Sequence, residues 1–210
     1  MTHDFRGLHV LADDDPRWRH APVSQARAAC AGGARVVQLR AKRATDSQAL
    51  AWAREIRALT RDAGVEFVMN DRVDLALACE ADAVHLGQDD LPPEAARRIA
   101  PSLAIGRSTH DTEQLARALS EPIDYVAYGP LFGTASKDTG YDARGLVALR
   151  EIARHCAPLP LVAIGGIDAS NARLAREAGA HAVAVISAVA NAADPLAAVR
   201  ELVAALGRAE

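Results

Sequence analysis

The feature that most constrains the fold of this sequence is a set of short apolar runs separated by longer segments of helical composition. Eight such runs occur along the 210 residues, and each is nearly continuous in valine, isoleucine, leucine and alanine. Runs that do not alternate with polar residues are typical of parallel strands covered on both faces. The predicted strands are Leu8–Leu11, Val36–Leu39, Phe67–Met69, Ala83–Leu86, Leu103–Ile105, Tyr125–Tyr128, Leu161–Ile164 and Ala182–Ile186.

The segments between the runs are rich in alanine, leucine, arginine and glutamate, which are good helix formers. In the first of them, apolar residues recur at steps of three and four, which predicts a helical face packed against the sheet. The residues of that face are Trp52, Ile56, Leu59 and Ala63. The predicted helices are Gln48–Ala63, Pro93–Ile99, Thr112–Leu119, Gly145–His155, Asn171–Ala178 and Pro195–Leu206.

No linker rich in proline, glycine or serine divides these units. Eight strand–helix units predict an α/β fold, a (β/α)8 TIM barrel that forms a single domain over residues 1–210. The alternative is an open doubly wound sheet, which would need a glycine-rich turn after the first strand. The sequence there, Ala12-Asp13-Asp14-Asp15-Pro16, contains no glycine. The expected fold is therefore a barrel, with its chemistry on the loops that follow the strands.

The composition excludes several classes of protein. The formal net charge is −3, so the basic excess typical of a protein that binds nucleic acid is missing. No apolar run approaches the roughly 18 residues of a membrane-spanning helix, and the first residues carry no apolar signal segment. The three cysteines are odd in number and far apart, which argues against a disulfide framework or a zinc site. We therefore expect a cytoplasmic protein without membrane or nucleic-acid partners, with assembly into a homo-oligomer left open.

Polar side chains follow the second predicted strand. Residues two apart in a strand point to the same side, so Gln38, Arg40 and Lys42 should face the barrel mouth together. Two cations beside an amide make an anion site, and the planar guanidinium group of arginine can bind a phosphate through two hydrogen bonds. The alternative is a solvated basic strand end, to which Arg43 would add.

Carboxylates follow the third and fourth predicted strands. Asp71 comes directly after Asn70, and Asp90 ends the sequence Gly87-Gln88-Asp89-Asp90. Carboxylates at neighbouring strand ends, beside an anion site, favour Mg²⁺ held between the protein and a substrate phosphate. Helix capping explains them equally well, because Asp71 and Asp90 both lie just before predicted helical segments.

The fifth strand is followed by Ser108, whose hydroxyl can donate to a ligand or belong to a turn or a cap. His110 follows closely, but no Ser/His/Asp constellation can be assigned to it. His85 lies inside an apolar run and is interpreted as a core histidine.

The last three strands are followed by loops suited to an anionic ligand. The longest loop, from Gly129 to Arg144, contains Thr134-Ala135-Ser136-Lys137, which can close over an anion or simply form surface. Gly166 follows the seventh strand and Ser187 follows the eighth. In barrels of this type, that pair of loops often forms a phosphate site from backbone N–H groups.

Six motifs, each at a predicted strand end, follow one another along the chain. They are Gln38-Leu39-Arg40-Ala41-Lys42, Asn70-Asp71-Arg72-Val73-Asp74, Val84-His85-Leu86-Gly87-Gln88-Asp89-Asp90, Gly129-Pro130-Leu131-Phe132-Gly133-Thr134-Ala135-Ser136-Lys137, Ala163-Ile164-Gly165-Gly166-Ile167 and Val185-Ile186-Ser187. Each motif alone is weak, but in this order they resemble the thiamine phosphate synthase family. The resemblance covers almost the whole chain, from about Leu8 to Leu206.

The resemblance implies a transferase that condenses 4-amino-2-methyl-5-hydroxymethylpyrimidine diphosphate with hydroxyethylthiazole phosphate to give thiamine phosphate and pyrophosphate. The implied reaction is dissociative: pyrophosphate leaves, a pyrimidine-methyl cation forms, and the thiazole nitrogen captures it. Such chemistry needs no protein nucleophile. It needs charge stabilisation of the leaving group and a second substrate held in line.

The resemblance also assigns residues. Mg²⁺, the implied cofactor, would be held by Asp71 and Asp90. The pyrimidine diphosphate would be bound by Gln38, Arg40, Lys42, Asn70, Ser108 and Lys137, of which Arg40, Lys42, Ser108 and Lys137 are the candidate catalytic residues. The thiazole phosphate would be bound by Thr134, Ser136, Gly166, Ile186 and Ser187.

A few positions depart from the family's pattern. The family usually has an aromatic residue near His9 and a threonine near Ala12, and both positions bear on the expected pyrimidine pocket. Ser136 stands where threonine is common, so the hydroxyl is kept. Two alternatives remain open. One is the related thiazole tautomerase on the same barrel, which uses a histidine in the region of Gly129-Pro130-Leu131, where this chain has none. The other is a non-catalytic regulator that binds phosphate ligands.

Overall fold

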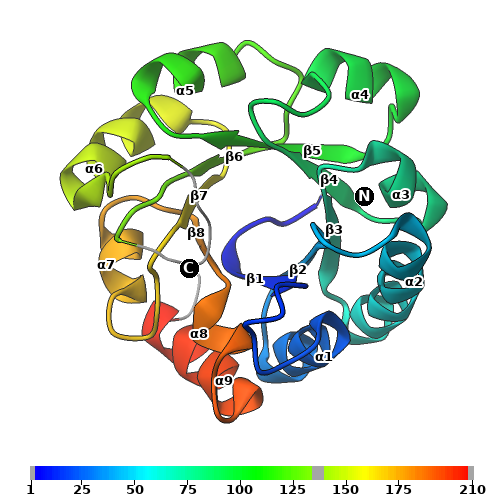
Figure 1. Cartoon of the computed structure of the whole chain (residues 1–210). Helices are drawn as coiled ribbons and strands as arrows, with labels where there is room; N and C mark the ends of the chain where they lie inside the picture. The colour runs from blue at the N-terminus through cyan, green and yellow to red at the C-terminus, as the bar shows by residue number, and fades with distance from the viewer. Residues whose placement is uncertain (1–2, 134–139, 208–210) are drawn as a thin grey trace.

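The computed structural model, which describes residues 3–133 and 140–207, is a closed barrel of eight parallel strands. The strands follow one another in chain order, and β8 pairs with β1 to complete the barrel (Figure 1). Each predicted apolar run overlaps one strand, so the predicted fold class is confirmed. The strands are β1 (Gly7–Asp13), β2 (Val36–Arg40), β3 (Glu66–Asn70), β4 (Ala83–Leu86), β5 (Ala104–Thr109), β6 (Tyr125–Tyr128), β7 (Leu161–Ile164) and β8 (Ala182–Val185).

The helices form an outer ring around the barrel (Figure 1). Helix α1 and the short α8 are absent from the predicted set, and α3 is predicted only as the helical segment that follows Asp71. In α1 the buried positions include Gln25 and Gly32 beside several alanines, so no apolar stripe marks this helix in the sequence. The helices are α1 (Pro22–Gly32), α2 (Asp46–Ala63), α3 (Val73–Ala78), α4 (Pro93–Ile99), α5 (Thr112–Ala118), α6 (Gly145–Cys156), α7 (Ala172–Glu177), α8 (Ser187–Ala190) and α9 (Pro195–Leu206).

Helix α2 packs with a different face from the predicted one. Of the predicted residues only Ile56 is buried, whereas Trp52 is half-buried at the flank and Ala63 is exposed. The face that is fully buried is built mainly from small residues, which allow the helix to approach the strands closely. Its residues are Ala49, Ala53, Ile56 and Thr60.

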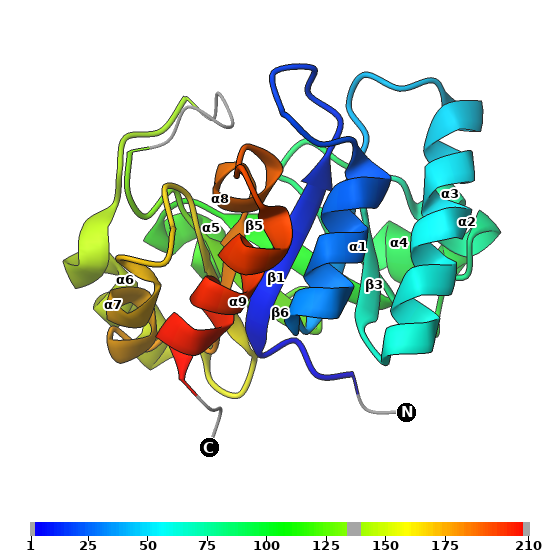
Figure 2. The same ribbon diagram turned by 90° about the horizontal axis from the view of Figure 1, so that it is seen from below.

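The barrel interior is filled unevenly. Its inner wall carries many alanines, which leave room for the large ring of Tyr125 from β6. Phe5 lies in the segment that enters β1, and its ring centroid is 4.5 Å from that of Tyr125. This segment crosses the barrel at the end where the strands begin (Figures 1 and 2). The interior is thereby closed at the amino-terminal end of the strands and stays open at the carboxyl-terminal end.

The loops that follow the strands gather at the open end, opposite both chain ends (Figure 2). None of the helices that the structure describes is long and apolar enough to span a membrane. Cys79 and Cys156 are buried and Cys30 is half-buried, and all three are free thiols. Burial raises the pKa of Cys30 and of Cys156 to about 11, so both stay protonated at neutral pH.

Candidate active site

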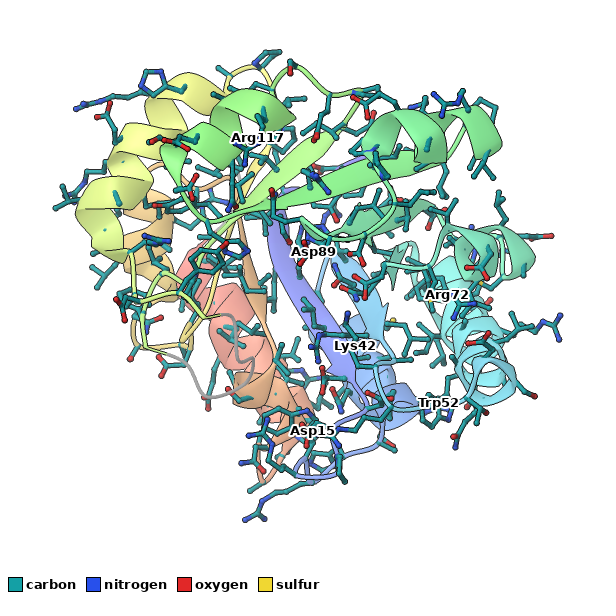
Figure 3. The ribbon with its side chains drawn as sticks, turned by 45° about the horizontal axis from the view of Figure 1, so that its top comes forward. Asp15, Lys42, Trp52, Arg72, Asp89 and Arg117 are labelled. Atoms are coloured by element: carbon teal, nitrogen blue, oxygen red, sulfur yellow. The ribbon has the colours of Figure 1, made fainter. Side chains whose placement is uncertain are left out.

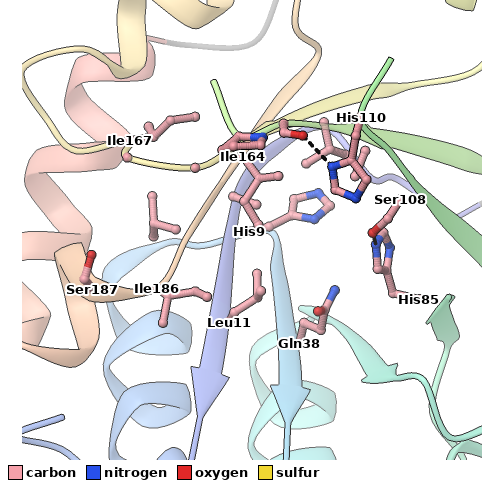
Figure 4. A pocket seen from close by; sticks show the side chains of 18 of the residues that line it. His9, Leu11, Gln38, His85, Ser108, His110, Ile164, Ile167, Ile186 and Ser187 are labelled. Carbon is pink, nitrogen blue, oxygen red and sulfur yellow. Dashed lines mark hydrogen bonds between the residues drawn. The ribbon is translucent and has the colours of Figure 1, made fainter. Parts of the chain in front are cut away.

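A cavity opens at the carboxyl-terminal end of the strands, where a barrel of this type carries its active site. The predicted binding residues divide between the wall of this cavity and its rim. Figure 4 shows Gln38 and Ser108 on one side of the cavity and Ile186 and Ser187 on the other. Gly166 also lines the wall. The rim residues lie at the ends of β2 to β4, outside the lining set; they are Arg40, Lys42, Asn70, Asp71 and Asp90.

The end of β2 is buried and ordered by contacts, unlike a solvated basic strand end. Gln38 is only 4% exposed, and its Oε1 atom has no hydrogen-bond partner in the described part of the chain. The Arg40 side chain is 17% exposed, and its Nη1 lies 2.5 Å from Oδ2 of Asp13. The side chains of Lys42 and Arg43 are exposed, so the solvated explanation fits these two residues and does not fit Arg40.

The carboxylates after β3 and β4 lie together at the rim. Nζ of Lys42 lies 2.5 Å from Oδ2 of Asp71. Burial raises the pKa of Asp71, the neighbouring carboxyl of Asp90 raises it further, and Lys42 opposes both effects. Asp71 also has a positive φ of 64°, a backbone conformation that residues other than glycine rarely adopt and that is often found at functional sites.

Neither carboxylate caps a helix, so the capping explanation is wrong. Helix α3 has Arg72 at its N-cap and α4 has Pro92, and neither cap makes a side-chain hydrogen bond. Oδ2 of Asp90 instead accepts from the backbone N–H of Gly87 at 2.6 Å. Figure 3 shows the neighbouring Asp89 and Lys42 over the barrel opening and Arg72 on the outer side.

The pair Asp71 and Asp90 fits a magnesium ion by its chemistry. Mg²⁺ prefers oxygen ligands, keeps several waters, and is commonly held by one or two carboxylates together with substrate phosphates. Burial, and after it the neighbouring Asp90, raises the pKa of Asp71, so a cation at this spot would favour the ionised carboxylates. Residues 3–133 and 140–207 hold no group of three or more histidine, cysteine or acidic residues suited to a metal.

His85 is buried, as the interpretation as a core histidine expects, and it also belongs to the cavity wall. Its Nε2 lies 2.8 Å from Oγ of Ser108, and its Nδ1 lies 3.0 Å from the hydroxyl of Tyr125. The sequence did contain a signal for this position. Side chains alternate along a strand, and the neighbours Val84 and Leu86 point outward into the helical layer, so His85 points into the barrel. Ser108 takes no part in capping α5, since Asp111 accepts from the backbone of Gln114 there.

Two further histidines line the cavity. Nδ1 of His110 lies 2.6 Å from the carbonyl oxygen of Gly129, so this nitrogen carries the proton and donates it. The His110 ring stacks on Tyr141 with centroids 4.2 Å apart. His9 is buried, its Nε2 lies 2.7 Å from the carbonyl oxygen of Phe5, and burial lowers its pKa to about 4. His9 is therefore neutral at neutral pH.

The opposite side of the mouth is built from glycines. Gly165 and Gly166 both have positive φ angles, of 100° and 65°. A Cβ atom on Gly166 would lie 2.5 Å from the carbonyl oxygen of Gly133, so Gly166 lets the loops after β6 and β7 touch. Ile186 is buried and Ser187 is exposed, at the point where β8 leads into α8. The predicted binding residues Thr134, Ser136 and Lys137 lie outside the described residues.

The comparisons with known proteins agree on one family. A family model described as thiamine monophosphate synthase matches residues 8–189. The thiamine-phosphate synthase of Anaeromyxobacter dehalogenans is 49% identical over 191 residues, which cover 90% of this chain and 85% of that protein. The thiamine-phosphate synthase of Methanoculleus marisnigri is 48% identical and covers 93% and 92% of the two chains.

The structural comparison gives the same result. The solved thiamine phosphate pyrophosphorylase from Pyrococcus furiosus is 38% identical and superposes with a TM-score of 0.88 over 95% of each chain. Sequence, fold and the order of the site motifs thus converge. The chain belongs to the thiamine monophosphate synthase family.

Proposed function

We propose that the mouth of this barrel binds 4-amino-2-methyl-5-hydroxymethylpyrimidine diphosphate and hydroxyethylthiazole phosphate, and joins them to thiamine phosphate with release of pyrophosphate. Membership of the family makes the chain a transferase of thiamine biosynthesis. The observation that carries the proposal is Gln38, whose buried Oε1 lacks a donor among the described residues and lines the cavity beside the charged rim. The amino group of a pyrimidine would supply that donor.

Arg40 and Lys42 would bind the diphosphate and stabilise the charge that develops as pyrophosphate leaves. Arg40 uses Nη1 for Asp13, and its other N–H groups have no hydrogen bond to the described residues. Since a guanidinium group has five N–H donors in a plane, those that remain suit two phosphate oxygens. Lys137 would add a third cation from the loop after β6.

Asp71 and Asp90 would hold Mg²⁺ at the same rim. When bound, the ion would supply positive charge to the oxygens of the substrate diphosphate. Lys42 forms an ion pair with Asp71, so its ammonium group lies next to the carboxylate at which the ion and the diphosphate would meet.

Ser108 and Asn70 would orient the pyrimidine ring. The Ser108 hydroxyl is fixed by His85, which is itself fixed by Tyr125, so the hydroxyl has one position on the cavity wall. Asn70 is buried and lies opposite His85 in the register of β3 and β4. A ring held between these groups has its reacting carbon in a defined direction, which lowers the entropic cost of the substitution.

Gly166, Ile186 and Ser187 would bind the thiazole phosphate, together with Thr134 and Ser136. Gly166 and Ser187 leave adjacent strands, so their loops adjoin. Replacement of Gly166 by valine is a poor test of this role, because a side chain there would first collide with Gly133 and Phe132 of the neighbouring loop. Ser187 offers a cleaner test, since it is exposed and begins a short helix.

The test is to mix both purified substrates with the protein and Mg²⁺ and to measure thiamine phosphate and pyrophosphate. We expect both products in equal amounts. Conversion of a thiazole tautomer without condensation would replace the proposal by the tautomerase. Tight binding of both substrates with no product would replace it by the non-catalytic regulator. A cytoplasmic location and assembly into a homo-oligomer remain part of the proposal, and fractionation and light scattering test them.

A further inference from the structure

The strand next to the diphosphate rim ends in carboxylates that point at its cations. Asp13 is the last residue of β1 and pairs with Arg40 in the register of β1 and β2. The Asp13 side chain is fully buried, and its Oδ2 accepts from Nη1 of Arg40 at 2.5 Å. Arg40 is thus held by Asp13 through Nη1, which leaves its other N–H donors for a ligand.

Asp13 is itself fixed from several directions. Its Oδ1 accepts from the indole nitrogen of Trp18 at 2.6 Å and from the backbone N–H of Asp15 at 3.0 Å. Its backbone N–H donates to Oε1 of Gln25 at 3.0 Å, and its carbonyl oxygen accepts from Nε2 of Gln25 at 2.9 Å. A carboxylate with this many partners cannot rotate freely, so the guanidinium group that it holds has a fixed orientation.

Asp14 acts on the backbone of the same rim. Its Oδ1 accepts from the N–H of Lys42 at 2.9 Å, and its Oδ2 accepts from the N–H groups of Arg43 and Ala44, each at 2.8 Å. Three consecutive N–H groups after β2 are therefore bound by one carboxylate. This contact fixes the base from which the Lys42 side chain reaches Asp71.

We propose that Asp13 and Asp14 are positioning residues for the diphosphate-binding cations: Asp13 orients the Arg40 side chain, and Asp14 fixes the backbone that carries Lys42. The inference rests on the proposed function of this rim as a diphosphate site. Neither carboxylate touches the substrate. Their negative charges weaken the attraction of the rim for an anion, and their value lies in preorganisation, which removes the need to order two long side chains during the reaction.

Charge and geometry predict opposite signs for the loss of Asp13. If attraction by net charge governed binding, Asp13→Asn would make the rim more positive and would bind an anion more tightly. If orientation governs binding, the same change weakens binding, because Arg40 loses its fixed edge. The sign of the change in affinity therefore decides between the two.

A matched control exists at the other end of the barrel. Asp82 precedes β4, and its two oxygens accept from both terminal nitrogens of Arg57, at 2.6 and 2.9 Å. The Arg57 side chain is 19% exposed, close to the 17% of Arg40, whereas the Asp82 side chain is 18% exposed and that of Asp13 is fully buried, so the control pair is the more exposed of the two. Asp82→Asn removes a comparable ion pair far from the mouth, and any effect that is only structural should appear in both variants.

The experiment compares Asp13→Asn, Asp14→Asn, Trp18→Phe and Asp82→Asn with the wild type. Calorimetry with inorganic pyrophosphate and Mg²⁺ measures binding, and steady-state kinetics measure KM for each substrate. We expect Asp13→Asn to weaken pyrophosphate binding about 10- to 50-fold and to raise KM for the pyrimidine diphosphate, with KM for the thiazole phosphate within twofold. Asp14→Asn should show the same selectivity at about 5- to 20-fold, and Trp18→Phe at about 2- to 5-fold. Asp82→Asn should lower only the melting temperature.

Pyrophosphate binding by Asp13→Asn that equals or exceeds that of the wild type would overturn the proposal, as would an equal loss in Asp82→Asn. Should Asp13→Asn not fold, Trp18→Phe decides, because it keeps the ion pair and removes one donor to Asp13. In the background of Arg40→Lys, Asp13→Asn should have at most a third of its effect, since the group that it orients is gone. A wild type that binds pyrophosphate but makes no thiamine phosphate overturns the proposed function alone and leaves this binding test valid.

Discussion

At the ends of β1 to β4 the rim of the barrel mouth carries charged side chains, whereas the described residues that line the mouth after β6 to β8 are uncharged and include glycines, an isoleucine and a serine. On the first side Arg40 pairs with Asp13 and Lys42 pairs with Asp71. On the second side, none of the described residues that line the cavity carries a charge. Under the proposed function, two anionic substrates would meet two kinds of site in one mouth.

The difference shows where each side gains its affinity. Under the proposed function, a diphosphate that must leave needs positive charge that is already in place, which Arg40, Lys42 and a Mg²⁺ ion held by Asp71 and Asp90 would provide. A monophosphate that only needs to be held can use backbone N–H groups in tight turns, as Gly165 and Gly166 allow by their positive φ angles. Side-chain substitutions should therefore be costly on the charged side and mild on the glycine side.

The largest effect should come from Arg40→Lys. The change keeps the charge but loses the planar fork and the fixed contact to Asp13, so we expect a loss of about 2–3 kcal/mol, or roughly 30- to 150-fold in kcat/KM for the pyrimidine diphosphate. Arg72→Lys is the matched control, because Arg72 forms its ion pairs with Asp46 and Asp74 on the outer surface. Wild-type turnover in Arg40→Lys would remove Arg40 from the diphosphate site.

The next effect should come from Asp90→Asn. The amide can still accept from the N–H of Gly87, so the local fold is kept while a negative charge is lost. We expect the Mg²⁺ concentration for half-maximal turnover to rise about tenfold, which corresponds to about 1.4 kcal/mol. Asp89→Asn, at the exposed neighbour, should change it less than twofold. Equal shifts in both variants would contradict the ligand assignment, and full activity in EDTA would contradict the metal.

A third prediction concerns His9, which is buried in the barrel interior beneath both sides of the mouth and is uncharged at neutral pH. The pKa of His9 is lowered to about 4 in the folded protein, against 6.5 in the unfolded chain. Between these values the unfolded state binds the extra proton, so stability falls as the pH falls from about 6.5 towards 4. Urea unfolding at pH 7 and pH 5.5 should show a loss from this group of about 1 kcal/mol.

His9→Phe isolates the contribution of His9, because it keeps an aromatic ring and cannot take up a proton. We expect its loss of stability between pH 7 and pH 5.5 to be smaller than that of the wild type by that amount. Parallel curves for wild type and His9→Phe would mean that His9 is protonated in the folded protein.

The sequence predicted the barrel well because parallel strands buried on both faces leave continuous apolar runs. It misplaced the packed face of α2 because large residues such as Trp52 dominate a pattern of hydrophobicity, whereas alanines such as Ala53 fit against the strands. Helix α1 was not predicted for a related reason: its buried positions include the polar residue Gln25, which hydrogen-bonds to the backbone of Asp13. Side-chain volume and polar contacts determine which face of α2 and of α1 is packed, and the pattern of hydrophobic residues in the sequence shows neither property.

The site was predictable where side chains alternate along one strand, as Gln38 and Arg40 do. It was not predictable where a residue acts through a distant partner. Asp13 lies 27 residues from Arg40, and nothing local in the sequence shows that the two meet. For Asp71, the sequence could not distinguish metal binding from helix capping, because an aspartate just before a helix suits both roles. Only the position of its carboxylate in the structure rules out capping.

The smallest effect should come from Ser187→Ala on the glycine side. The hydroxyl is one donor among several backbone N–H groups that remain, so we expect a loss of about 0.5–1 kcal/mol, seen as a two- to fivefold rise in KM for the thiazole phosphate. KM for the pyrimidine diphosphate should stay unchanged, because Ser187 faces Gln38 and Ser108 from across the cavity (Figure 4). Ser120→Ala, at an exposed turn after α5, is the control and should change neither value. A larger effect of Ser187→Ala on the pyrimidine diphosphate than on the thiazole phosphate would mean that the two sides of the mouth do not divide the substrates between them.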